Sequence, residues 1–157
     1  MYGYSLGGIL ALQLCVQDIR IKAGLCSDGG ILGNAWETGI LQPFLSIQPE
    51  KRTSTRAENR ANNLDHEAYM FGQGIHQLRL DFLLENSNNE MFFLTIPDTK
   101  HNNFNDMALF EPQNENMIKV RLCHNIINDY TLSFFNKYLK TIDNKLMNVS
   151  TKKYKKV

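Results

Sequence analysis

Short apolar runs alternate with longer amphipathic stretches along the chain, as strands and helices do when they succeed one another. Three runs are predicted to be strands: residues 21–27, residues 43–47, and residues 91–96, which Pro97 stops. Apolar residues at three- or four-residue spacing predict helices over 64–85 and 117–140. With a strand at the N-terminus we expect an α/β fold, a mostly parallel sheet of about four strands flanked by helices.

The apolar positions also predict which helix faces are buried. Residues 6–16 are apolar on nearly all sides, as in a helix buried against a sheet. Residues 50–63 are polar and are expected to begin a helix near Ser54. The expected face of helix 64–85 comprises Ala68, Phe71, Ile75, Leu78, Phe82 and Leu83. That of helix 117–140 comprises Ile118, Leu122, Ile126, Ile127, Tyr130, Phe134 and Tyr138.

Composition limits the classes of function. A chain of 157 residues with 43% hydrophobic and 21% charged residues is typical of one globular domain. The net charge of +1 gives no reason to expect a nucleic-acid partner. Residues 1–141 are expected to form the domain. Residues 142–157, of which the last six carry four lysines, are expected to be a basic disordered tail with at most weak membrane-surface contact. Three cysteines without C-x-x-C spacing favour free thiols in a reducing, cytoplasmic setting.

The motif with the most chemical information lies at the start of the chain. Gly3-x-Ser5-x-Gly7 matches a nucleophile elbow, which holds a serine on a sharp turn between a strand and a helix. The flanking glycines are expected where the strained backbone leaves no room for β-carbons. Ser5 is therefore the candidate nucleophile, and the Leu6 amide that follows it is the candidate oxyanion donor.

A serine nucleophile needs a base, and the base needs an acid to orient it. Of the four histidines, His101 alone follows a strand directly; His66, His76 and His124 lie in helical stretches and are interpreted as structural. The carboxyl ends of parallel strands meet at one edge of a sheet, so Ser5 and His101 can converge there. Asp28 and Glu50 each follow a predicted strand, and position alone leaves the choice of acid open. Neither a metal ion nor an organic cofactor is required for this chemistry.

Four stretches carry a resemblance to a known family: residues 3–8, 23–30, 101–106 and 134–139. They resemble the elbow, the strand that ends in the catalytic aspartate, the histidine loop and the closing helix of α/β-hydrolases. Within that superfamily they are most similar to platelet-activating-factor acetylhydrolase and lipase-like esterases. The resemblance implies that Asp28, rather than Glu50, is the acid. Tyr4 stands where the family usually has histidine.

The resemblance also implies an activity, the hydrolysis of small-molecule or phospholipid carboxylic esters by Ser5, His101 and Asp28. It spans roughly residues 2–140 but only the C-terminal half of the family's domain. We therefore expect a missing N-terminal half, or an oligomeric partner, to complete the sheet and the oxyanion hole. The alternatives are an inactive hydrolase fragment, or a thioesterase or peptidase that uses the same triad.

Overall fold

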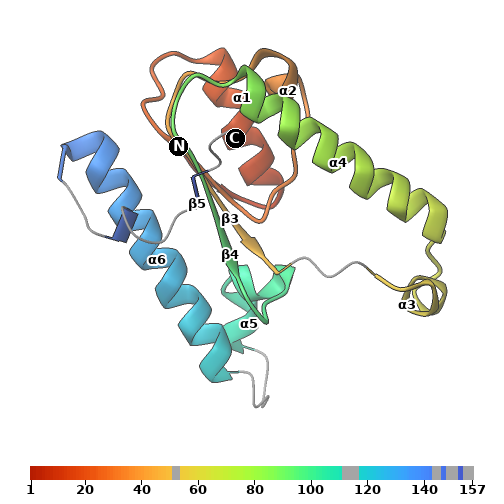
Figure 1. Ribbon diagram of the computed structural model, residues 1–157. Helices are drawn as coiled ribbons and strands as arrows, with labels where there is room; N and C mark the ends of the chain where they lie inside the picture. Colours follow the sequence, from red (N-terminus) through yellow and green to blue (C-terminus); the bar gives the residue numbers. More distant parts are fainter. Residues whose placement is uncertain (51–53, 111–116, 143–145, 148–151, 154–157) are drawn as a thin grey trace.

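The sheet has four parallel strands in chain order. The computed structural model describes residues 1–50, 54–110, 117–142, 146–147 and 152–153. Strands β1 (Tyr2–Tyr4), β2 (Gly24–Ser27), β3 (Phe44–Pro49) and β4 (Met91–Ile96) pair side by side, and the short β5 (Lys152–Lys153) pairs antiparallel with β4. The prediction of an α/β fold with a mostly parallel sheet of about four strands is confirmed (Figure 1).

Helices fill the connections between the strands. They are α1 (Leu6–Gln17), α2 (Ala35–Thr38), α3 (Arg56–Ala61), α4 (His66–Asn86), α5 (Met107–Phe110) and α6 (Met117–Lys140), with a 3₁₀ helix, η1 (His101–Phe104), after β4. Side-chain capping hydrogen bonds stabilise the N-termini of two of these helices. Thr55 and Glu58 form a capping box on α3, and the Asp65 carboxylate accepts the Ala68 N–H at the start of α4.

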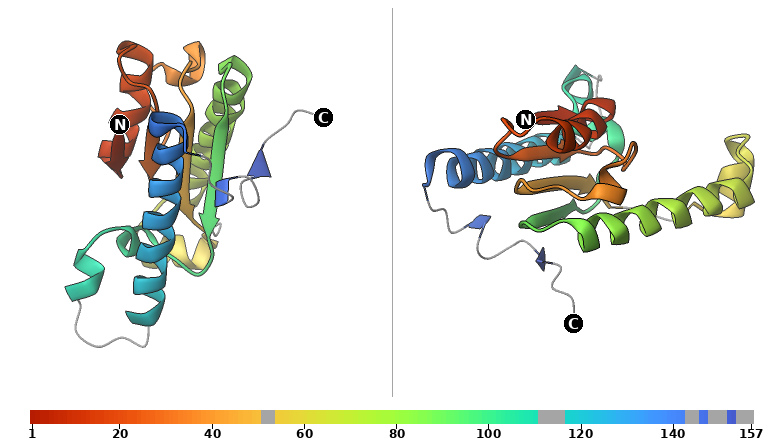
Figure 2. Two further views of the ribbon diagram at one scale, coloured as in Figure 1. Left: turned by 90° about the vertical axis from the view of Figure 1, so that its left-hand side faces the viewer. Right: turned by 90° about the horizontal axis from the view of Figure 1, so that it is seen from above.

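The two faces of the sheet bury different residues because side chains alternate along each strand. On one face Leu25, Leu45, Ile47 and Phe92 pack against the α6 residues Cys123, Ile127, Tyr130 and Phe134. On the other face Cys26, Phe44 and Met91 pack against Leu12 and Cys15 of α1, Ala35 of α2 and Leu83 of α4. Figures 1 and 2 show α6 on the opposite side of the sheet from α4. The molecule therefore has three layers.

The predicted apolar face of α4 is mostly not buried, which corrects that expectation. Only Leu83 of the six residues is buried; Phe71, Leu78 and Phe82 are exposed. Figure 1 shows the reason: only the C-terminal part of α4 lies along the sheet, and its N-terminal part extends beyond it toward α3. Apolar spacing predicted the helix correctly but could not show what the helix would pack against.

Three further expectations need adjustment. Helix α1 is not buried on all sides, because Leu6 and Leu10 are exposed. On α6, Leu122 is also exposed, while the side chain of Ile118 lies outside the described residues. In the expected tail, Met147 is buried against the α6 face of the sheet. Residues 143–145, 148–151 and 154–157 lie outside the described part of the chain.

Candidate active site

The three predicted catalytic residues lie at one edge of the sheet. Ser5 follows β1, Asp28 follows β2, and His101 begins η1 a few residues after β4. Because the strands are parallel, their carboxyl ends meet at this edge. Positive φ angles occur here at Ser5 (54°), Asp28 (47°) and Asp98 (56°). Three of the five described non-glycine residues with positive φ thus lie just after a strand; the other two, Asn63 and Thr141, follow helices.

Ser5 stands at the junction of β1 and α1, as the elbow motif predicts. Its backbone has φ 54° and ψ −119°, and its N–H donates to the Ser27 carbonyl at 2.9 Å. The Ser5 side chain makes no capping hydrogen bond to α1, although it occupies the N-cap position. The Leu6 amide lies in the first turn of α1, where backbone N–H groups have no acceptor within the helix. The elbow thus combines a hydroxyl not used in capping with an amide suited to binding an oxyanion.

The glycines of the elbow have unequal roles. A β-carbon on Gly3 would lie 2.0 Å from the carbonyl oxygen of Gly7, and one on Gly8 would lie 2.5 Å from the sulfur of Cys26. A β-carbon on Gly7 would meet no atom within 4 Å. The expectation that Gly7 is needed for space is therefore wrong. Gly3 and Gly8 are the positions at which strand and helix approach too closely for a side chain.

Asp28 and His101 form a hydrogen bond across 73 residues of sequence. The Nδ1–H of His101 donates to Oδ2 of Asp28 at 2.6 Å, since a carboxylate can only accept. The Asp28 side chain is 17% exposed and that of His101 is 49% exposed. The Asp28 N–H donates to the Ile47 carbonyl at 2.8 Å, which anchors the residue to β3. In this tautomer Nε2 of His101 is the nitrogen that can accept a proton.

Glu50, the other candidate acid, is engaged elsewhere. Its carboxylate accepts the Asp98 N–H at 3.3 Å, and its own N–H donates to the Ile96 carbonyl. Within residues 1–50 and 54–110, the His101 ring donates its hydrogen bond to Asp28 and not to Glu50. Glu50 therefore steadies the turn after β4.

Ser5 and His101 share an edge but not a hydrogen bond. Among the described residues, no hydrogen bond joins the Ser5 hydroxyl to the imidazole. Such contacts are often long before a substrate binds. Two neighbouring residues were not identified from the sequence as site residues: Tyr4, which stacks on the imidazole, and Asn105, which donates to the Tyr4 hydroxyl. Tyr4 had one signal, since histidine is usual at this position in the hydrolases that the sequence resembles; Asn105 had none that separates it from the other asparagines.

His66 and His124 have partners other than Ser5, Asp28 and His101. The Nδ2 of Asn59 is 2.9 Å from Nδ1 of His66, and Nδ1 of His124 is 3.8 Å from Asp106. In the described part of the chain, no three His, Cys, Asp or Glu side chains are placed to hold a metal ion.

Cys26 is the thiol closest to the site, and its environment makes it a poor nucleophile. Burial raises the pKa of the Cys26 thiol to about 11, despite the Gly29 N–H that points at the sulfur from 3.2 Å. At neutral pH the thiol stays protonated, whereas the thiolate is the reactive form. The nucleophile at this edge is therefore expected to be the Ser5 hydroxyl.

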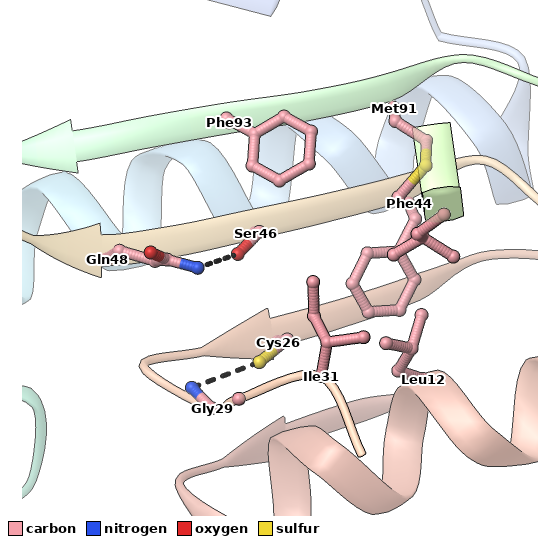
Figure 3. A pocket seen from close by; sticks show the side chains of 11 residues that line it. Leu12, Cys26, Gly29, Ile31, Phe44, Ser46, Gln48, Met91 and Phe93 are labelled. Atoms are coloured by element: carbon pink, nitrogen blue, oxygen red, sulfur yellow. Dashed lines mark hydrogen bonds between the residues drawn. The ribbon is translucent and has the colours of Figure 1, made fainter. Parts of the chain in front are cut away.

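A pocket lies on the α1 side of the sheet, between the strands and the loop that follows Asp28 (Figure 3). Its lining is mostly apolar, with Ser46 and Gln48 hydrogen-bonded to each other at 2.9 Å. Gly29 belongs to this lining, and a β-carbon there would lie 2.7 Å from the Ser5 carbonyl. Ser5 and His101 themselves do not line it. The pocket thus adjoins the elbow without containing the reacting groups.

No helix in the described ranges is long and apolar enough to cross a membrane.

Comparisons with known proteins assign no family to the chain. A scan against protein-family models finds no match for the chain. A search of curated proteins likewise finds no match.

Proposed function

We propose that this chain is a serine hydrolase of the α/β-hydrolase class that cleaves carboxylic esters. The observation that carries the proposal is the 2.6 Å hydrogen bond between Asp28 and His101, at the same sheet edge as a strained serine. Each of the three residues comes from a different strand end, and their order along the chain, Ser, Asp, His, is that of this class. Residues that only pack the fold would need neither a strained backbone at Ser5 nor a half-exposed imidazole hydrogen-bonded to a carboxylate.

The geometry supports a two-step mechanism. The Ser5 Oγ attacks the acyl carbonyl while its proton passes to Nε2 of His101. Asp28 accepts the hydrogen bond from Nδ1–H of His101 and stabilises the positive imidazolium, but the Nδ1 proton stays on the ring. The carbonyl oxygen becomes an oxyanion, to which the Leu6 N–H donates. When the carbon–oxygen bond to the alcohol breaks, His101 returns the proton to the leaving alkoxide.

The acyl-enzyme is then hydrolysed by the same groups. His101 takes a proton from water, and the resulting hydroxide attacks the acyl carbonyl. The bond to Ser5 Oγ breaks, the carboxylic acid leaves, and Ser5 recovers its proton from His101. From the resemblance we infer small-molecule or phospholipid esters with short acyl chains as substrates.

The test compares two carboxylate substitutions in an ester hydrolysis assay. In Asp28→Asn, the amide can face Nδ1 with its NH₂ group and favour the wrong tautomer of His101, so kcat for p-nitrophenyl acetate is expected to fall about 10⁴-fold. Glu50→Gln is the matched control, because Glu50 contacts the Asp98 backbone rather than the imidazole. It is expected to keep most of the activity. Absence of saturable hydrolysis by the unmodified chain, or equal losses in the two variants, would contradict the proposal.

A further inference from the structure

Tyr4 contacts the candidate base, His101, at atoms other than the Nδ1 that Asp28 contacts. The rings of Tyr4 and His101 are stacked, with centroids 5.0 Å apart and planes inclined by 25°. The Tyr4 hydroxyl donates to the backbone carbonyl of His101 at 3.0 Å. One side chain therefore holds both the imidazole face and the backbone that carries it, and the chain places it directly before Ser5.

Asn105 fixes the tyrosine hydroxyl in turn. Its Nδ2 donates to the Tyr4 hydroxyl at 3.0 Å, and its Oδ1 accepts the Met107 N–H at 2.9 Å. These two bonds determine which end of the amide faces the phenol. Because the phenol accepts from Asn105, its own proton is directed to the His101 carbonyl. The result is a directed series of hydrogen bonds from the start of α5, through Tyr4, to the histidine loop.

We propose that Tyr4 and Asn105 are positioning residues that hold the His101 imidazole for proton transfer with Ser5. With Asp28 on Nδ1 and Tyr4 on the ring face and the backbone carbonyl, Nε2 is the ring nitrogen left for the nucleophile. The inference rests on the proposed function for its catalytic consequence. Its structural part, the restraint of the imidazole by Tyr4, can be tested without turnover.

The test uses three variants and one control. Tyr4→Leu removes the stacking and the hydroxyl, Tyr4→Phe removes the hydroxyl alone, and Asn105→Ala leaves the hydroxyl without its donor. Tyr2→Leu is the matched control, since Tyr2 lies on the same strand, is 47% exposed and makes no ring contact among the described residues. Misplacement of a catalytic group by about 1 Å costs on the order of 10²-fold in rate.

We expect Tyr4→Leu to lower kcat for p-nitrophenyl acetate about 10²-fold with little change in KM. Tyr4→Phe and Asn105→Ala should lose less, and Tyr2→Leu should match the unmodified chain. A purely structural role would instead reduce the amount of active protein and leave the kcat of the folded fraction unchanged. If the proposed function holds, titration of the active sites with a fluorophosphonate distinguishes a positioning role of Tyr4 from a purely structural one.

Proton NMR of the His101 ring gives the readout that does not need turnover. The stacked tyrosine is expected to shift the imidazole signals upfield, and the shift should persist in Tyr4→Phe and disappear in Tyr4→Leu. A shift that survives Tyr4→Leu would overturn the inference, as would loss of the shift with unchanged kcat in an active enzyme. An inactive chain whose His101 signals respond to Tyr4→Leu would defeat the proposed function while supporting the restraint of the imidazole.

Discussion

Replacing Ser5 with alanine is expected to lower kcat for ester hydrolysis about a million-fold, because the bond-forming oxygen is lost. His101 and Asp28 cannot replace it, since together they act only to take and return the serine proton. The raised pKa of Cys26 leaves no thiolate close by to act instead. The measurement is kcat for p-nitrophenyl acetate under saturating substrate.

Ser27→Ala is the matched control for this substitution. Ser27 lies beside Tyr4 in the register of β1 and β2, and its hydroxyl is buried without a hydrogen-bond partner in the described structure. Removing such a hydroxyl should cost little stability. The Ser27 carbonyl that accepts the Ser5 N–H is unchanged. Comparable activity in Ser5→Ala and the unmodified chain would show that Ser5 is not the nucleophile.

Gly3→Ala is expected to destabilise the protein by about 3 kcal/mol, the upper end of the usual cost of overpacking. The new β-carbon would lie 2.0 Å from the Gly7 carbonyl oxygen, and neither backbone can yield without separating α1 from β1. For a chain of this size the melting temperature should fall by roughly 10 °C. Calorimetry on the purified variant measures this directly.

Gly7→Ala distinguishes crowding from the general effect of adding a methyl group. Gly7 lies in the first turn of α1, and a β-carbon there meets no atom within 4 Å. Alanine favours a helix over glycine, so the change should be neutral or stabilise by up to about 1 kcal/mol. If Gly3→Ala melts at the same temperature as Gly7→Ala, the close approach at Gly3 does not exist in solution.

The positions of Ser5, Asp28 and His101 could be predicted because each signal is local. A glycine-flanked serine before an apolar helix, and polar residues directly after apolar strands, are both readable within a few residues. Parallel pairing then brings the strand ends together without further information. The bounds of β4 and α6 match the predicted ranges for the same reason: β4 is a short apolar run that Pro97 stops, and α6 has apolar residues at helical spacing.

The choice between Asp28 and Glu50 could not be made from strand ends, because both follow one. It depends on where the turn after β4 goes: the Asp98 N–H contacts Glu50, while His101 reaches Asp28. The contact between Tyr4 and His101 could not be predicted either, since the two residues lie 97 positions apart. For α4, spacing gave the helix but not the extent of its contact with the sheet.

The central claim is that Ser5 is an activated nucleophile, and mapping a fluorophosphonate adduct by mass spectrometry tests it most directly. We predict one adduct per chain, located on the tryptic peptide of residues 1–20 and absent from Ser5→Ala. Asp28→Asn should form the same adduct far more slowly, because the imidazole is no longer held in the tautomer that accepts the serine proton. An adduct on another residue, equal labelling of Ser5→Ala, or no reaction of the folded chain would contradict the account.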